Sequence, residues 1–191
     1  MKAELWYSVV VRDSQGKFIS RERRKSKSFV RQWNDIIWAQ VTGASGYIKR
    51  IDGNETWGIA PIAENLLMTS VVGVEASQSI AVGSDNTPVT ISDYALKTQI
   101  AHGLGAGQLN HQAATVNESV VSGPNCGFVV ERAFVNNSGG DVTVRESAIY
   151  VRMKGPVYYG YACVVRDVLT MPQTIPNGGS LSMSYTLRVT V

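Results

Sequence analysis

The clearest hydrophobic pattern in the chain is a strict alternation over residues 181–191. Every second position from Leu181 to Val191 is apolar or aromatic, and the positions between are Ser, Thr or Arg. A period of two places successive side chains on opposite faces of an extended chain. The turn signal Pro176–Gly179 precedes this stretch. We therefore expect a long terminal β-strand with one buried face, paired with strands from earlier in the chain.

Short apolar runs separated by Gly-, Pro-, Asn- and Asp-rich turns fill most of the chain after residue 65. Strands at near-regular spacing with such turns are typical of sandwiches and jelly rolls. The sequence predicts a mainly β protein, an antiparallel β-sandwich of jelly-roll type over residues 66–191. Besides the terminal strand, the expected strands are 66–75, 79–82, 89–91, 115–122, 128–136, 142–151 and 158–167.

The first 42 residues predict a β-hairpin followed by one helix. An apolar run at 5–11, a turn at Asp13–Gly16 and an extended segment at 17–23 have the pattern of a hairpin. We expect residues 1–42 to be packed on the sandwich or appended to it.

The helix is expected over residues 28–41. Its apolar stripe recurs every three or four residues and consists of Phe29, Trp33, Ile36, Ile37 and Val41. Trp33 and Trp38 are five residues apart, so their side chains point to different sides of the axis. The simpler expectation is that both are core or half-buried. The alternative is that one packs on the sheet while the other, Trp38, is exposed as an interface anchor.

Residues 43–65 are rich in Gly, Asn and Asp, and contain Trp57. We expect a long loop or extended arm here. A loop of this length in a compact domain is usually functional or shared with a neighbour. Trp57 is therefore a second aromatic candidate for an interface.

Positive charge is concentrated near the N-terminus. Residues 1–50 hold eleven Lys and Arg against four acids, and residues 51–191 hold seven against eleven. This asymmetry indicates head-to-tail or layered contacts. The basic run consists of Arg21, Arg23, Arg24, Lys25, Lys27 and Arg31.

The simplest interpretation of the basic run is a solvated face. Docking onto an acidic protein surface is the next, and nucleic-acid binding is the third. Nucleic-acid binders usually present a whole basic domain or interleave aromatic residues, whereas most of this chain is acidic. The contact candidates are Arg23, Arg24 and Lys25, together with Trp38 and Trp57.

Candidate chemistry is sparse. His102 and His111 flank a glycine-rich segment with no Cys, Asp or Glu between them, so a flexible loop is favoured over a metal site. Asp85 and Asn86 are explained by turn formation, and their spacing to Asp93 matches no calcium-binding loop. No catalytic motif is present. We expect no enzyme activity, no cofactor and no bound metal.

The N-terminus lacks the apolar core of a signal peptide, and no apolar run is long enough to span a membrane. We therefore expect synthesis in the cytoplasm and no membrane partner. In that compartment Cys126 and Cys163 are expected to be two reduced thiols rather than one disulfide bridge.

From about Ile80 onward the chain resembles a group of bacteriophage virion proteins that includes head-decoration, head-fibre and tail-fibre components. The resemblance lies in the order and content of several segments, and it extends less specifically to the hairpin and helix at 4–42. The matching segments are 82–96, 100–103 with 107–109, 134–150, 165–169, 174–181 and the terminal strand.

The resemblance implies a non-enzymatic virion structural protein that assembles on a phage particle, as a capsid decoration or a head or tail appendage. Its partners would be copies of itself and capsid or tail proteins. One alternative is a receptor- or glycan-binding fibre module, in which Tyr158, Tyr159 and Tyr161 would contact sugars on a host surface. A weaker alternative is a nucleic-acid-binding protein.

Overall fold

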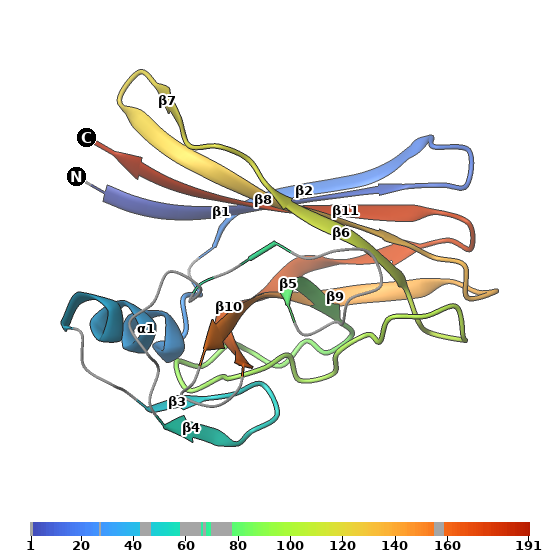
Figure 1. Ribbon diagram of the computed structural model, residues 1–191. Helices are drawn as coiled ribbons and strands as arrows, with labels where there is room; N and C mark the ends of the chain where they lie inside the picture. The colour runs from blue at the N-terminus through green and yellow to red at the C-terminus, as the bar shows by residue number, and fades with distance from the viewer. Residues whose placement is uncertain are drawn as a thin grey trace.

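The computed structural model describes two antiparallel β-sheets packed together, with a short hairpin and one helix at one end (Figure 1). The predicted mainly β fold, with its N-terminal hairpin and one helix, is confirmed. The jelly-roll topology stays a prediction. The structure describes residues 2–26, 28–42, 47–57, 66, 68–69, 78–154 and 159–191.

The elements follow one another along the described chain with a single helix after the first two strands. They are β1 (Lys2–Arg12), β2 (Phe18–Ser26), α1 (Arg31–Thr42), β3 (Tyr47–Lys49), β4 (Glu55–Trp57), β5 (Ser79–Gly83), β6 (Asn110–Val116), β7 (Val120–Ser122), β8 (Asn125–Val135), β9 (Val142–Lys154), β10 (Tyr159–Ile175) and β11 (Ser180–Thr190).

The six-stranded sheet, called the large sheet below, has the order β2-β1-β11-β8-β6, with β7 paired to β8. The terminal strand β11 lies between β1 and β8 and pairs with both along its whole length. This confirms the strand predicted from the alternation. Its buried side chains Leu181, Met183 and Tyr185 are each at most 1% exposed.

The N-terminal hairpin supplies two strands of the large sheet. At its turn, the Asp13 carboxylate accepts hydrogen bonds from the backbone amides of Gln15 and Lys17, each at 2.9 Å. The second strand runs on to Ser26. The basic residues at 21–25 therefore lie within a strand, at the edge of the sheet.

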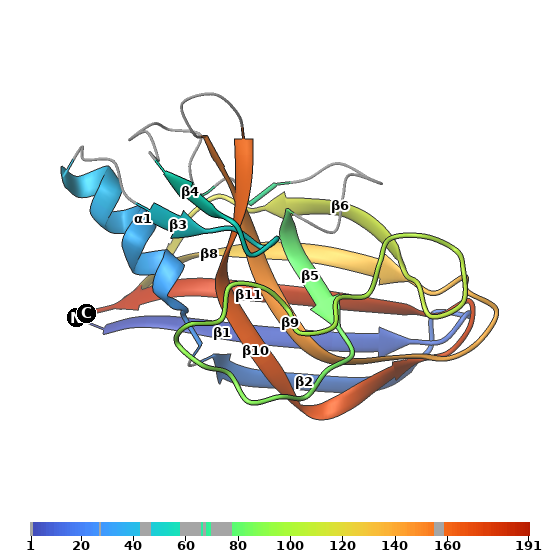
Figure 2. The same ribbon diagram turned by 90° about the horizontal axis from the view of Figure 1, so that it is seen from below.

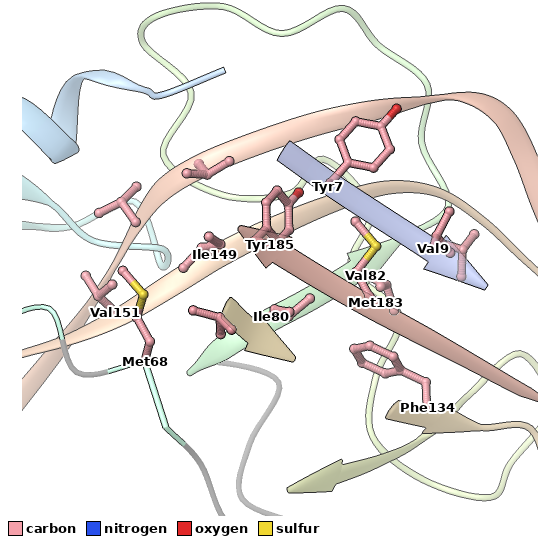
Figure 3. Close-up of a cluster of buried hydrophobic side chains, with 14 of the residues drawn as sticks. Tyr7, Val9, Met68, Ile80, Val82, Phe134, Ile149, Val151, Met183 and Tyr185 are labelled. Carbon is pink, nitrogen blue, oxygen red and sulfur yellow. The ribbon is translucent and has the colours of Figure 1, made fainter. Parts of the chain in front are cut away.

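The three-stranded sheet, called the small sheet below, has the order β10-β9-β5. Its strands cross those of the large sheet steeply (Figure 2). Residues 148–151 of β9 are all 0% exposed, so both faces of the small sheet are covered. One face packs on the large sheet, where Ile80, Val82, Ile149 and Val151 gather with Met183 and Tyr185 (Figure 3).

The other face of the small sheet is covered by a layer without regular strands. Val89 and Leu96, from residues 84–100, pack there with Val30, which precedes the helix, and with Ala148 and Tyr150 of β9. The strand predicted at 89–91 is wrong, because residues 89 and 90 have no regular secondary structure and Ile91 begins a turn. The side chain of Asp93 accepts a 2.9 Å hydrogen bond from the backbone amide of Thr90 there.

Other predicted boundaries shift. β6 begins at Asn110 rather than at 115, and β10 continues to Ile175 through register shifts after Cys163 and after Val168. Residues 43–65 contain the β3–β4 hairpin instead of being loop throughout. The rest of that segment, and most of the strand predicted at 66–75, lie outside the described residues.

The helix begins at Arg31, three residues later than predicted. Phe29 forms a β-bridge with Val165, and the amide of Val30 donates to the carbonyl of Val164, so the chain is extended there. The buried helix residues are Gln32, Ile36 and Ala39. The predicted stripe is partly wrong, because Ile37 is 37% exposed and Val41 is 80% exposed. In the part of the chain that is described, no helix has the length and apolar character needed to cross a membrane.

Candidate binding site at the basic edge of the large sheet

An open pocket of about 530 Å³ lies at β2. Arg23, Arg24 and Lys25 line it, together with Trp6 on the neighbouring strand and Asp167, Val168 and Thr170 of β10. Successive side chains of a strand point to opposite faces. Three consecutive residues can therefore line one pocket only where the pocket wraps around the edge of the strand. We call it the basic edge pocket, and it brings together three of the sequence-predicted contact residues.

On the outer face of the sheet, Glu4 holds the pocket residues in place. Its carboxylate accepts hydrogen bonds from Lys25 Nζ at 2.6 Å, Arg188 Nη2 at 2.6 Å and Trp6 Nε1 at 3.2 Å. The guanidinium groups of Arg23 and Arg188 lie 5.5 and 5.8 Å from the centre of the Trp6 ring. Both distances are within the range of cation–π attraction. The indole is thus fixed among cations on a half-buried surface.

On the inner face, Glu22 fastens β2 to β10. Its carboxylate accepts hydrogen bonds from Tyr7 Oη at 2.6 Å and from the backbone amides of Thr170 and Met171 at 3.1 and 3.3 Å. Burial alone would raise the pKa of Glu22, but these hydrogen bonds outweigh it and lower that pKa. Glu22 therefore stays ionised, and its role is to hold β2 against β10.

Asp167 forms part of the pocket wall and links the two sheets. It accepts hydrogen bonds from Ser26 Oγ at 3.0 Å and Tyr185 Oη at 3.1 Å. Burial raises the pKa of Asp167 despite these bonds. The lining residues therefore comprise three cations, at positions 23–25, and one carboxyl group, whose pKa is raised. The basic edge pocket is suited to an anionic partner.

The three cations are not equivalent. The alternation of β2 places Arg23 and Lys25 on the outer face with Arg21, whereas Arg24 shares the inner face with the buried Glu22. The Arg24 side chain is nevertheless 58% exposed, and its Nε lies 3.9 Å from Glu22 Oε1. Cationic side chains therefore lie on both faces of β2 at the edge of the large sheet.

A second surface is an apolar groove of about 330 Å³ between the start of α1 and the end of the large sheet. Phe29 and Trp33, whose ring centres are 4.7 Å apart, form one wall. Phe128, Leu187 and Val189 are on the other. Val189 is 43% exposed although it continues the buried face of β11. The large sheet therefore projects beyond the small sheet, and the helix covers the projection only in part.

Exposed apolar residues gather at this same end. Figure 1 shows both chain termini, β7 and α1 together at this end of the molecule. Val120 and Val121 on β7 are 63% and 74% exposed, and Val191 is 84% exposed. Trp38 on the helix is 52% exposed, so the alternative with one exposed tryptophan is the one observed. We call the groove and these residues the apolar end; Trp38 belongs to it and not to the basic edge pocket.

Trp57 is the remaining predicted contact residue. Its backbone lies in β4, paired with Tyr47, and its side chain is outside the described residues. The side chains of Tyr158 and Tyr159 are also outside them. Tyr161 is half-buried on β10 opposite Arg152.

The two histidines lie close together, with His111 buried and His102 half-buried. His111 is 0% exposed, and its ring centre is 5.5 Å from that of His102. Burial, with smaller effects of Arg132 and His102, lowers the pKa of His111 to about 3. Among the described residues, no group of three or more His, Cys, Asp and Glu is placed to hold a metal ion. Cys126 and Cys163 are free thiols.

The sequence-based reasoning missed a buried ion cluster on the outer side of the small sheet. Arg166 Nη2 lies 2.8 Å from Glu146 and Arg166 Nη1 lies 2.8 Å from Asp93. Glu146 also accepts hydrogen bonds from the backbone amides of Lys97 and Thr98 at 3.2 and 2.9 Å. These contacts hold the layer of residues 84–100 against the sheet. We call Arg166, Glu146 and Asp93 the buried ion cluster.

One feature of this cluster could have been noticed in the sequence. Glu146 and Arg166 stand in apolar strand sequences, where an isolated charge needs a partner. Gly83 is adjacent: a Cβ there would lie 2.5 Å from Glu146 Oε1, so a side chain does not fit. The pairing itself was not predictable, because Asp93, Glu146 and Arg166 are far apart in the sequence.

Comparisons of the chain with protein-family models, with curated proteins and with solved structures gave no match.

Proposed function

We propose that this chain is a non-enzymatic structural protein of a bacteriophage particle that docks through the basic edge pocket onto an acidic surface of a capsid or tail protein. The observation that carries the proposal is the convergence of Arg23, Arg24 and Lys25 beside Trp6 in one open pocket. Arg and Trp are enriched among the residues that dominate binding energy at interfaces. Complementary charge also accelerates docking and selects the partner.

The resemblance to phage virion proteins supports the particle as the setting. Three of the resembling segments, 82–96, 134–150 and 165–169, supply the three members of the buried ion cluster. Residues that hold the fold together are the ones a shared scaffold would retain. The jelly-roll topology is part of this proposal.

Contacts with further copies of the chain are the second part of the proposed assembly, and the apolar end would provide them. Soluble monomers rarely expose large contiguous apolar patches, and such patches often mark protein interfaces. Here an apolar groove and exposed side chains such as Trp38 and Val121 occur at one end of the molecule.

Binding to purified capsids and tails, measured by co-sedimentation, tests the proposal. We expect the wild-type protein to bind, and a triple Arg23→Glu, Arg24→Glu, Lys25→Glu variant to remain folded and to bind at least tenfold more weakly. A matched control, Lys17→Glu with Lys49→Glu, reverses two exposed charges outside the pocket and should bind as wild type. A wild-type protein that binds neither particle and stays monomeric at high concentration contradicts the proposal.

Recognition of an acidic glycan is the second candidate, because the pocket combines an aromatic side chain, Trp6, with three cations. A glycan array separates the two. Tight binding to a defined acidic sugar, weakened by Trp6→Ala, favours the receptor-binding role. Affinity for DNA that falls steeply with salt would favour nucleic-acid binding instead.

A further inference from the structure

The outer edge of β2 is open. β2 is the first strand in the order of the large sheet, and no other described strand pairs with it on that side. An edge strand offers a row of backbone donors and acceptors to any extended segment that reaches it. The basic edge pocket is lined by three consecutive residues of this edge strand, Arg23, Arg24 and Lys25.

The side chains of β2 restrict which segment can pair with it. Arg21, Arg23 and Lys25 alternate along the outer face. Like charges placed opposite one another across two strands are destabilising, whereas opposite charges stabilise the pair. The β2 strand of a second copy would set cations against cations, so it does not fit. The complementary segment carries an acid at every second position.

We propose that β2 accepts an extended acidic segment of the docking partner as an additional strand, with Glu or Asp side chains opposite Arg21, Arg23 and Lys25. This inference rests on the proposed docking function of the basic edge pocket and names its mode. Backbone hydrogen bonds provide affinity in such strand addition, and alternate side chains provide specificity. Trp6, on β1 and beside Arg23, lies on the same outer face, with β2 between it and the added strand.

Basic residues on an edge strand can also serve only to prevent strand pairing. The two roles predict opposite results with an acidic strand. If the basic residues serve only to prevent pairing, no added strand will bind to β2. If β2 is a docking strand, it will bind a strand whose acidic residues lie opposite its own basic residues.

The test uses the full-length protein and four synthetic ten-residue peptides of equal Thr and Glu content. One peptide alternates Thr and Glu, one has the same residues in two blocks, and the other two repeat the alternating sequence with backbone N-methyl groups on either the Glu or the Thr residues. We expect the alternating peptide to bind most tightly, and at least one N-methylated form to lose binding. Equal binding of all peptides would show attraction of charge without strand addition, and it overturns the inference.

Two single variants sharpen the result. Arg23→Ala removes a cation from the face of β2 that lies opposite the acidic side chains. It should weaken the affinity for the alternating peptide by up to about fivefold. Arg24→Ala removes one cation of the same pocket from the other face and should have a smaller effect. Equal losses for both variants contradict the assigned face.

Amide hydrogen exchange gives a readout that does not depend on affinity. On binding of the alternating peptide, every second backbone amide of residues 20–26 should become protected, since only alternate amides face the edge. Particle binding that is abolished by the charge-reversed triple variant, without this protection, refutes strand addition and leaves the docking function intact. Particle binding that is insensitive to that variant refutes the docking function itself.

Discussion

The small sheet and the exposed margins of the large sheet place the same kinds of residue in opposite environments. In the small sheet, Arg166 is 0% exposed and is held by two carboxylates, and both sheet faces are covered. At the margin, Arg23 and Arg24 are exposed beside an open edge, and Val189 continues a buried stripe into a groove. The difference separates charges and apolar groups that hold the fold from those left available to a partner.

This contrast predicts that changes in the interior abolish or weaken folding, while changes at the margins leave stability intact and alter association. The largest effect is expected from the terminal strand. Deletion of residues 180–191 removes β11 from between β1 and β8, so the large sheet loses its central pairing. We expect no cooperative unfolding transition by circular dichroism.

A shorter deletion, of residues 189–191 alone, removes only the projecting end of that strand. We expect this variant to remain folded, because Val189 and Val191 are 43% and 84% exposed. A folded protein lacking all of 180–191 would show that the core does not depend on β11.

Breaking the buried ion cluster is the next largest change. Glu146→Gln leaves Arg166 with a single carboxylate partner in a fully buried site, and removal of one member of a buried pair costs about 3–5 kcal/mol. Chemical denaturation measures this loss. The matched surface change, Arg24→Ala, should alter the free energy of unfolding by no more than about 0.5 kcal/mol. A similar loss of unfolding free energy in both variants would contradict the distinction between the interior and the exposed margin.

The two helix tryptophans offer the same comparison within one element. Trp33 packs against Phe29 and the core, so Trp33→Ala should cost about 3 kcal/mol. Trp38 is 52% exposed, and Trp38→Ala should be nearly neutral for stability while weakening self-association. Thermal unfolding and sedimentation velocity on both variants check the two outcomes separately.

The last prediction concerns pH. Because burial lowers the pKa of His111 to about 3, the unfolded chain binds a proton below about pH 6.5 that the folded chain does not bind until near pH 3. Stability is therefore lost as the pH falls through this window, by up to about 1.4 kcal/mol per pH unit. We expect His111→Leu to flatten the slope, measured by denaturant titrations between pH 7 and about 4. Parallel curves for the two proteins would contradict this assignment.

How far local sequence predicts this protein depends on the range of the interactions involved. The alternation at 181–191 and the Asp13 turn predicted strands and a hairpin because both depend on neighbouring residues. The predicted apolar stripe of the helix is wrong at Ile37 and Val41, because the helix buries a different face against β10 and β3. Apolar periodicity does not show which neighbour a helix will meet.

The sequence predicted which basic residues belong to the candidate site, but not how they are arranged in space. A basic run at 21–25 is visible in the chain, yet its division between two faces of an edge strand required β2 to extend to Ser26. The part played by Trp6 and Glu4 was not anticipated, because the site forms only when β1 pairs with β2 and β11.

By itself, the sequence determined the class of the fold, the hairpin, the terminal strand and the location of the positive charge. These features follow from local periodicity, turn chemistry and composition. Only the tertiary structure decided that β11 lies at the centre of the large sheet, that Arg166 joins Glu146 and Asp93, and that β2 has an open edge. Each of these depends on contacts between residues distant in the chain, for which local patterns carry no information.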